Sequence, residues 1–320
     1  MYDVDPEVAA GLIAMFGPEP AAPVPVDDWA TRRHNTHAMF SELRTKYAPA
    51  VDVETQDVTM TVAEGASVGL RIYRPHTRDS DGVLLYLHGG GMIMCNLETH
   101  DAICREYAVR TGMCVVAVDY RLAPEHPFPV PVDDCMAALR WVAGQRDQGW
   151  APHRIVVGGE SAGGGLAAAV ALRARDEGGP EIAGLLLVYP MLDDRTCERD
   201  AGLDAVATWT YDDHLTAWRA YVGTDGAASG YAAPLRAETV VGLPPTYLEV
   251  GELDIFRAEI TAFAGRLLES GVRLEFHLHP AVPHAFELFA PAAAVSERAM
   301  ADRVRAIKSL QNKKRAGLDK

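Results

Sequence analysis

The sequence predicts an α/β fold in which a mostly parallel β-sheet is covered by helices on both faces. Short segments that are apolar at almost every position, such as residues 82–87, 114–118 and 182–189, are typical of strands buried on both faces. Amphipathic segments of helical length lie between these strands along the chain, which is the order that a parallel sheet with crossover helices requires. The two observations together place the strands in one sheet.

The elements can be assigned in chain order. In the first 50 residues, two helix-like segments flank a proline-rich stretch, and Asp27 and Asp28 are good N-caps for the second, which carries Phe40, Leu43 and Tyr47 on one face. Strands are expected at 55–61, 68–73, 82–87, 114–118, 154–157, 182–189, 246–250 and 273–279. Helices are expected at 133–143, 162–177, 212–222, 256–269 and 296–310.

The composition excludes several classes of protein. The 320 residues include 44 Asp and Glu against 30 Lys and Arg, and the net charge of −14 argues against nucleic acid and anionic membranes as main partners. The five cysteines include no Cys-x-x-Cys pair, and there is no His-Glu-x-x-His motif, so neither a metal site, a disulfide framework nor a cofactor is expected. The acidic N-terminus does not resemble a signal peptide, and no apolar run is long enough to span a bilayer, so we expect a cytoplasmic protein.

The strongest motif is the pentapeptide from Gly159 to Gly163, which reads Gly-Glu-Ser-Ala-Gly. It follows the expected strand 154–157 and opens an alanine-rich helix, and this context is typical of a nucleophile elbow with Ser161 at the turn. The turn brings the residues two before and two after the serine close together, so both must be small. A phosphate-binding loop is the alternative, but it needs a lysine that is absent here.

A second motif, His88-Gly89-Gly90-Gly91, follows directly after the expected strand 82–87. Three glycines leave their backbone N–H groups unobstructed, so these groups can converge on one oxygen, as an oxyanion hole requires. We predict that Gly89, Gly90, Gly91 and the N–H of Ala162 form this hole, and that His88 braces the loop. A dinucleotide-binding loop is the alternative, but the G-x-G-x-x-G pattern fails after Gly91.

The acid of a serine triad must follow Ser161 along the chain in this arrangement, and the base must follow the acid. The candidate acids are Glu249, Glu252, Asp254 and Glu259. We favour Asp254 because it lies just beyond the expected strand 246–250, in a loop that can present its carboxylate. Glu249 falls within that strand, Glu252 is interpreted as a cap or a solvated turn residue, and Glu259 falls in the first turn of a helix.

The candidate bases are His277, His279 and His284. The first two alternate with Phe276 and Leu278, which indicates the polar face of an edge strand. We therefore favour His284, which lies beyond that strand in a loop that can reach the elbow.

These motifs together resemble the hormone-sensitive-lipase family of carboxylesterases, which has the α/β-hydrolase fold, and the bacterial short-acyl, heroin-esterase-like enzymes look most similar. The resemblance covers about residues 83–290 and includes the segment Asp119-Tyr120-Arg121-Leu122-Ala123-Pro124-Glu125, interpreted as an Arg121–Glu125 support beneath the site. The chain departs from the family at Cys95 and Ala285, where glycine is usual.

The resemblance also implies a helical cap built from two separate stretches. Residues 1–51 and the insertion 193–235, which interrupts the alternation of strands and helices, are expected to form the cap. Residues 52–192 and 236–320 are then expected to form the catalytic domain.

The predicted function is hydrolysis of small, short-acyl carboxylic esters through an acyl-enzyme on Ser161, with His284 as base and Asp254 as the residue that holds it. The same triad could serve an amidase, a lactonase or a thioesterase, and a non-catalytic ligand-binding relative is a further alternative. The expected edge strand 273–279 and the family resemblance make a homodimer plausible.

Overall fold

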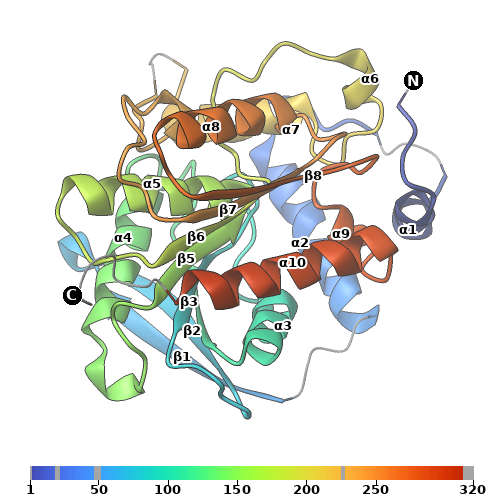
Figure 1. Ribbon diagram of the computed structural model, residues 1–320. Coiled ribbons are helices and arrows are strands. Elements are labelled where there is room, and N and C mark those ends of the chain that lie inside the picture. The colour runs from blue at the N-terminus through green and yellow to red at the C-terminus, as the bar shows by residue number, and fades with distance from the viewer. Residues whose placement is uncertain (1, 19–21, 47–51, 225–227, 313–320) are drawn as a thin grey trace.

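The computed structural model describes residues 2–18, 22–46, 52–224 and 228–312. Within these residues, an eight-stranded sheet is formed by β1 (Val53–Thr61), β2 (Ser67–Pro75), β3 (Val83–Leu87), β4 (Cys114–Asp119), β5 (Ile155–Glu160), β6 (Gly184–Val188), β7 (Thr246–Gly251) and β8 (Leu274–His279). The strand order is β1-β2-β4-β3-β5-β6-β7-β8 (Figure 1). Strand β2 runs antiparallel to β1 and β4, and every other pairing is parallel, which confirms the predicted fold class.

The helices form a layer on each face of the sheet (Figure 1). Helices α3 (Asp101–Thr111) and α10 (Ala294–Leu310) pack against each other on one face. The other face is covered by α4 (Val130–Gly144), α5 (Ala162–Asp176) and α8 (Arg257–Glu269). The sequence did not indicate α3, because its buried side consists of small or partly polar residues, namely Cys104, Tyr107, Ala108 and Thr111.

Strand β5 is longer than the sequence predicted. It continues through Gly158 and Gly159, which pair with Leu186 and Leu187 of β6. Glycine is normally unfavourable inside a strand. Here it is required, because a Cβ on Gly158 would lie 2.8 Å from the Leu186 Cβ. The strand therefore runs directly into Ser161.

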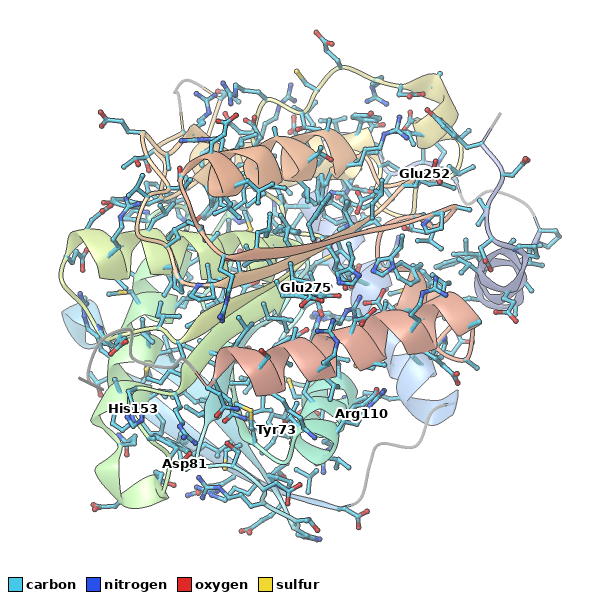
Figure 2. All side chains as sticks on the ribbon, viewed as in Figure 1. Tyr73, Asp81, Arg110, His153, Glu252 and Glu275 are labelled. Atoms are coloured by element: carbon cyan, nitrogen blue, oxygen red, sulfur yellow. The ribbon has the colours of Figure 1, made fainter. Side chains whose placement is uncertain are left out.

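The parallel direction of β3 and of β5 to β8 brings their carboxyl ends to one edge of the sheet. Figure 2 labels Glu252 at this edge, and Asp81 and His153 at the opposite edge. The loops that follow these strands carry His88, Ser161, Asp254 and His284. Residues far apart in sequence thus meet at the edge where α/β proteins place their ligands.

Two segments distant in sequence pack together above this edge. Helix α2 (Trp29–Lys46) contacts α7 (Tyr211–Val222), and the Arg32 Nε lies 2.7 Å from the Asp213 Oδ1. On the face predicted for α2, Leu43 is buried and Phe40 is half-buried, whereas Tyr47 lies outside the described residues. The short α6 (Ala201–Asp204) precedes α7, and α1 (Pro6–Phe16) instead contacts α9 (Phe286–Phe289).

The support expected from Arg121 and Glu125 is more distributed than the sequence suggested. Arg121 donates from Nε (2.9 Å) and Nη2 (2.7 Å) to the two carboxylate oxygens of Asp134 on α4. Glu125 accepts two hydrogen bonds from Arg33 on α2, at 2.7 and 2.9 Å. This segment therefore connects the sheet to both helices.

None of the helices in the described ranges combines the length and the apolar character that crossing a bilayer would need.

Candidate active site

Ser161 occupies the sharp turn between β5 and α5. Its φ of 53° and ψ of −121° are backbone angles that residues other than glycine rarely adopt. A Cβ on Gly159 would lie 2.4 Å from the Leu87 carbonyl oxygen, and a Cβ on Gly163 would lie 2.0 Å from the same atom. Both positions therefore accept only glycine, and the two glycines permit the turn that presents the serine hydroxyl.

Ser161, Asp254 and His284 lie together at the carboxyl ends of the strands. The His284 Nε2 is 3.0 Å from the Ser161 Oγ, and the His284 Nδ1 is 2.6 Å from the Asp254 Oδ2. The other carboxylate oxygen of Asp254 accepts a hydrogen bond from the Phe256 N–H at 2.9 Å. All three side chains are buried, so the hydroxyl, imidazole and carboxylate form one continuous chain away from bulk solvent.

Three aromatic rings surround the His284 imidazole. The Tyr189 ring centroid is 4.6 Å from it, that of Phe256 is 5.1 Å away, and that of Trp209 is 6.4 Å away. The Thr208 hydroxyl also donates to the His284 carbonyl oxygen. Sequence patterns did not indicate that these four residues meet His284, because they lie 28 to 95 residues from it along the chain and only the fold brings them together.

The glycine loop after β3 lies directly beside the elbow. A Cβ on Gly89 would be 3.4 Å from the Ser161 Cβ. Gly90 and Gly91 have φ values of 102° and 61°, and the Gly90 carbonyl accepts hydrogen bonds from the amides of Ile93 and Met94. Among the described residues, nothing accepts a hydrogen bond from the amides of Gly90 and Gly91, so both remain available to a ligand oxygen.

Cys95 and Ala285, the two positions where the resemblance described above leads us to expect glycine, both adopt left-handed backbone conformations. Cys95 has a φ of 73° and Ala285 a φ of 54°. Glycine adopts such angles without steric cost, whereas a residue with a Cβ does not. The loop shapes are therefore kept here by residues that are conformationally less suited to them.

His88 packs inside the glycine loop rather than facing the serine. Its ring stacks on Tyr120 with centroids 4.1 Å apart, and its carbonyl oxygen accepts a hydrogen bond from the Tyr120 hydroxyl at 2.7 Å. Burial lowers the pKa of His88 to about 3, so the ring is neutral at neutral pH. This geometry fits a bracing role.

Glu160, which precedes the serine, is held in a buried cluster. Its carboxylate is bound by the Tyr86 hydroxyl and by the His100 Nε2. Burial alone would raise the pKa of Glu160, but the charge and hydrogen bond of His100 and the hydrogen bond of Tyr86 outweigh it and lower the pKa to about 2. The Glu160 Cγ would be 3.2 Å from a Cβ on Gly89, so the Glu160 side chain packs against the glycine loop.

The other acids considered from the sequence have structural partners. Glu249 is completely buried against Arg303, and Glu252 accepts a hydrogen bond from the Ala281 amide at 2.8 Å. Glu259 is also buried and binds the Leu192 amide at 2.6 Å. Burial raises the pKa of Glu259 well above its ordinary value.

The interpretation of the two strand histidines needs one correction. His277 is half-buried and binds Glu275 at 2.7 Å, but His279 is buried, with its Nε2 3.4 Å from the Glu249 Oε2. An alternating pattern places both on one face, and the sequence could not show that α10 covers this face. His279 is thus a core residue and not part of a solvated strand surface.

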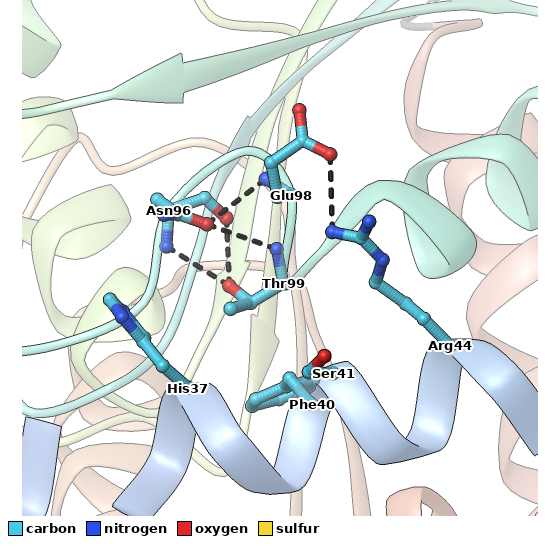
Figure 3. Close-up of a pocket in the computed structure, with 7 residues that line it drawn as sticks. All are labelled: His37, Phe40, Ser41, Arg44, Asn96, Glu98 and Thr99. Atoms are coloured by element: carbon cyan, nitrogen blue, oxygen red, sulfur yellow. Dashed lines mark hydrogen bonds and ion pairs between the residues drawn. The ribbon is translucent and has the colours of Figure 1, made fainter. Parts of the chain in front are cut away.

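A pocket of about 180 Å³ lies beside the site, between α2 and the turn that follows the glycine loop. Figure 3 shows His37, Phe40, Ser41 and Arg44 of α2 facing Asn96, Glu98 and Thr99. Neither Ser161 nor His284 lines it. It connects to the site indirectly, because the Thr99 hydroxyl contacts the His100 Nδ1 at 2.8 Å and His100 binds Glu160.

One group of potential metal ligands occurs in the described ranges, namely Glu275, His277 and Asp302. Both carboxylates contact Arg305, whose guanidinium binds Glu275 and lies 3.1 Å from the Asp302 Oδ1. The arginine already balances these charges, so the group is better described as an ion-pair cluster between β8 and α10.

Comparison with known proteins identifies the family. The model of the family described as "alpha/beta hydrolase fold" matches residues 84–288 of the chain. The esterase LipI of Mycobacterium tuberculosis is 41% identical over 232 residues, which cover 68% of this chain and 71% of LipI. The chain is a carboxylesterase of the hormone-sensitive-lipase family.

Further proteins that are similar to this carboxylesterase are also named as ester hydrolases. The ethyl acetate hydrolase of Pseudomonas putida is 31% identical over 246 residues, covering 72% of this chain and 74% of the relative. Among solved structures, a bacterial heroin esterase superposes with a TM-score of 0.87 at 36% identity, covering 97% of this carboxylesterase and 98% of the esterase.

Two buried histidines make the folding stability of this carboxylesterase sensitive to acid. Burial lowers the pKa of both His88 and His214 to about 3, so both are neutral in the folded state at pH 5. In the unfolded chain each takes up a proton below about pH 6.5. We therefore expect the stability to be highest above pH 6.5 and to be lost as the pH falls toward 3, at up to about 1.4 kcal/mol per pH unit for each histidine.

Denaturant unfolding between pH 7 and pH 4 measures this effect. His214→Phe should reduce the slope of the unfolding free energy against pH by up to about 1.4 kcal/mol per pH unit, because one fewer proton is taken up on unfolding. The matched control is His153→Phe, at an exposed position labelled in Figure 2, which should leave the slope unchanged. Equal slopes for the two variants would contradict the assignment of the acid sensitivity to His214.

Proposed function

We propose that this carboxylesterase hydrolyses small, short-acyl esters through an acyl-enzyme on Ser161, with His284 as general base and Asp254 as its orienting carboxylate. The observation that carries the proposal is the chain of contacts from the Ser161 Oγ to the His284 Nε2 at 3.0 Å and from the His284 Nδ1 to Asp254 at 2.6 Å. This is the arrangement that activates a serine for attack on a carbonyl carbon.

In the acylation step, the Ser161 Oγ attacks the ester carbonyl carbon while the His284 Nε2 accepts the hydroxyl proton. The tetrahedral intermediate collapses, the bond to the alkoxy oxygen breaks, and the imidazolium donates the proton to the departing alcohol. In deacylation, water takes the place of the alcohol: His284 accepts its proton, the hydroxide attacks the acyl carbon, and the serine oxygen leaves with the proton returned. Asp254 remains ionised and stabilises the imidazolium.

The oxyanion of each intermediate is assigned to the glycine loop and the start of α5. Within the described ranges, the amides of Gly90 and Gly91 have no acceptor, and the N–H of Ala162 lies at the first position of α5, where helical N–H groups have no intrahelical partner. Gly89 contributes mainly by bringing the loop against Ser161. The positive end of the α5 dipole adds to the field at the same point.

We assign residues 1–51 and 193–235 to a cap, and residues 52–192 and 236–320 to the catalytic domain. Contacts between α2 and α7 support a shared unit, since Arg32 binds Asp213 and Arg219 binds Asp27 at 2.9 Å. Arg33 connects this unit to the glycine loop through a hydrogen bond of 2.6 Å to the Ile93 carbonyl. The cap is therefore tied to the loop that would bind the oxyanion.

Trp209 supports the preference for short acyl groups. A Cβ on Gly91 would lie 2.7 Å from the Trp209 Cη2, and the indole also lies near His284. The indole therefore forms a wall between the proposed oxyanion hole and the proposed base. Such a wall leaves little room for a long chain beside the reacting carbon.

A series of p-nitrophenyl esters tests this preference. We expect kcat/KM to fall by at least about 100-fold from butyrate to dodecanoate, and Trp209→Ala to recover about 10-fold of that loss, since each excluded methylene contributes about 1 kcal/mol or more. Trp29→Ala, at an aromatic cap residue that stacks on Arg33, is the matched control. Amide, lactone and thioester substrates belong in the same panel, because faster turnover of any of them would replace the ester assignment.

We further propose that β8 pairs with a second copy of the chain. Strand β8 is the last strand of the sheet, and Leu278 on it is 53% exposed. An unpaired edge with an exposed apolar side chain favours association. Light scattering should give twice the mass of one chain for the wild type and the mass of one chain for Leu278→Arg. The control is Leu268→Arg, at a 62% exposed position on α8, which should keep the mass of two chains. A wild-type protein with the mass of one chain would contradict the pairing.

We also place the protein in the cytoplasm. The five cysteines are free, and Cys95, Cys104, Cys114 and Cys135 are buried. Unpaired buried thiols are typical of a reducing compartment. Cell fractionation with a cytoplasmic marker tests this assignment.

A further inference from the structure

Arg303 of α10 is a fully buried guanidinium outside the proposed triad. Only 1% of its surface is exposed, and its Nε donates to the Glu249 Oε1 at 2.9 Å. Its Nη1 donates to the Glu287 Oε1 at 2.6 Å. One buried arginine thus joins a carboxylate in the middle of β7 to a carboxylate in the segment that carries His284.

The same Glu287 oxygen accepts a second hydrogen bond, from the Tyr189 hydroxyl at 2.6 Å. The Tyr189 ring contacts the His284 imidazole, with centroids 4.6 Å apart and planes inclined by 62°. Phe256 contacts the imidazole at 5.1 Å and 83°. The imidazole is therefore held between two aromatic rings, and the hydroxyl of one ring is fixed by a buried charged group.

The backbone of Tyr189 adds a second sign of a specific role. Its φ is 33°, in the left-handed region, and its N–H donates to the Glu249 carbonyl at 2.9 Å. Such conformations of non-glycine residues are uncommon and concentrate near functional sites. The conformation turns the side chain from the end of β6 toward His284.

The network is not explained by stability. Burial alone would raise the pKa of Glu249, but the charges and hydrogen bonds of Arg303 and His279 together outweigh it and lower the pKa to about 2, so the carboxylate remains ionised. Replacing a buried ion pair with well-packed apolar residues is often neutral or stabilising. A charged network at this depth therefore calls for a role in fixing geometry.

We propose that Tyr189 is a positioning residue for His284, and that Glu287 and Arg303 fix its ring so that the imidazole keeps the orientation needed to accept the Ser161 proton. This inference rests on the proposed function of the triad. The ring centroid also lies 4.6 Å from the ring that becomes the imidazolium during each proton transfer, and an aromatic ring at this distance can stabilise a cation.

The test compares Tyr189→Phe and Glu287→Gln in the full-length protein. Tyr189→Phe keeps the ring and removes its hydrogen bond, and Glu287→Gln keeps the size of the side chain and removes the charge. With p-nitrophenyl acetate, we expect kcat to fall by about 10-fold in each variant while KM changes by less than about 2-fold, because small misplacements of a catalytic group lower the rate more than binding. Arg303 is left intact because its removal would strand two buried carboxylates.

The matched control is Glu275→Gln. Glu275 of β8, labelled in Figure 2 beside α10, binds Arg305, which lies on α10 as Arg303 does. Glu275 itself lies at the protein surface. The Glu275→Gln variant should retain the wild-type kcat. An equal fall in Glu275→Gln, or a rise in KM without a fall in kcat in the Tyr189 and Glu287 variants, would overturn the proposal.

Two further readouts separate positioning from general destabilisation. We expect a sharp low-field proton NMR resonance of the His284 Nδ1–H in the wild type and a broader one in Tyr189→Phe, and the same line width in both proteins would overturn the proposal. The acid limb of kcat/KM should also shift in Glu287→Gln. The titratable groups that face His284 are Asp254, Tyr189 and His214, and the pKa of His214 is lowered to about 3 by burial, so His214 does not contribute to this limb near neutral pH.

The failure of this inference can be told from a failure of the triad itself. If a fluorophosphonate does not label Ser161 in the wild type, the proposed function is wrong. If it labels Ser161 at the same rate in the wild type and in Tyr189→Phe, only the positioning role is overturned. The expected result is complete labelling in both proteins, about 10-fold slower in the variant.

Discussion

Ser161→Ala is expected to lower kcat for p-nitrophenyl acetate by about 10⁴- to 10⁶-fold. The hydroxyl is the only group of this residue that can form the acyl-enzyme, and its Oγ lies 3.0 Å from the His284 Nε2. The residual rate should come from the glycine loop and substrate binding alone. Steady-state kinetics with enough protein to detect this residual rate measure the effect.

The fold should tolerate this substitution. Serine and alanine both carry a Cβ, so the strained φ of 53° costs about the same in either protein. The thermal midpoint of unfolding should therefore stay within a few degrees of the wild type. Ser296→Ala, at a buried serine on α10, is the matched control and should keep full activity. A Ser161→Ala protein that folds and retains more than about 1% of the wild-type kcat would contradict the assignment of the nucleophile.

Asp254→Asn is expected to lower kcat by about 10⁴-fold. The carboxylate accepts a hydrogen bond from the His284 Nδ1, which leaves the Nε2 free to accept the Ser161 proton. An asparagine amide that donates toward the Nδ1 favours the opposite tautomer and cannot stabilise the imidazolium. The loop should keep its shape, because an asparagine oxygen can still accept the hydrogen bond from the Phe256 N–H.

Glu252→Gln is the control for this prediction. Glu252 lies two residues away and was a competing candidate from the sequence, but its carboxylate binds the Ala281 amide. Its substitution should change kcat by less than about 3-fold. Comparable losses in the two variants would mean that general disturbance of the loop, and not the Asp254 carboxylate, explains the effect.

The sequence was most informative where chemistry or packing restricts the residue type. The strands β3 and β6 are buried at every position, and their apolar runs are visible in the sequence. Gly159 and Gly163 are predictable because a Cβ at either would meet the Leu87 carbonyl. The requirement for Ser, acid and base in this chain order reduced the candidates to a few residues, and the structure brings Ser161, Asp254 and His284 into contact.

The remainder depends on contacts that local patterns do not encode. His279 looked like part of a polar strand surface, but α10 covers it and Arg303 supplies a buried charge for its neighbour Glu249. Tyr189 and Trp209 approach His284 only because separate strand ends and an insertion converge there. Helix α3 was missed because cysteine, alanine and threonine on its buried side give a weak amphipathic signal.

The most direct test of the triad is to map the adduct of a fluorophosphonate by mass spectrometry. We predict one adduct per chain, on the peptide that contains Ser161, and much slower labelling in His284→Ala. The reason is that the hydroxyl needs the adjacent imidazole to lose its proton. An adduct on any other serine, or labelling of Ser161 at an unchanged rate without His284, would contradict the account.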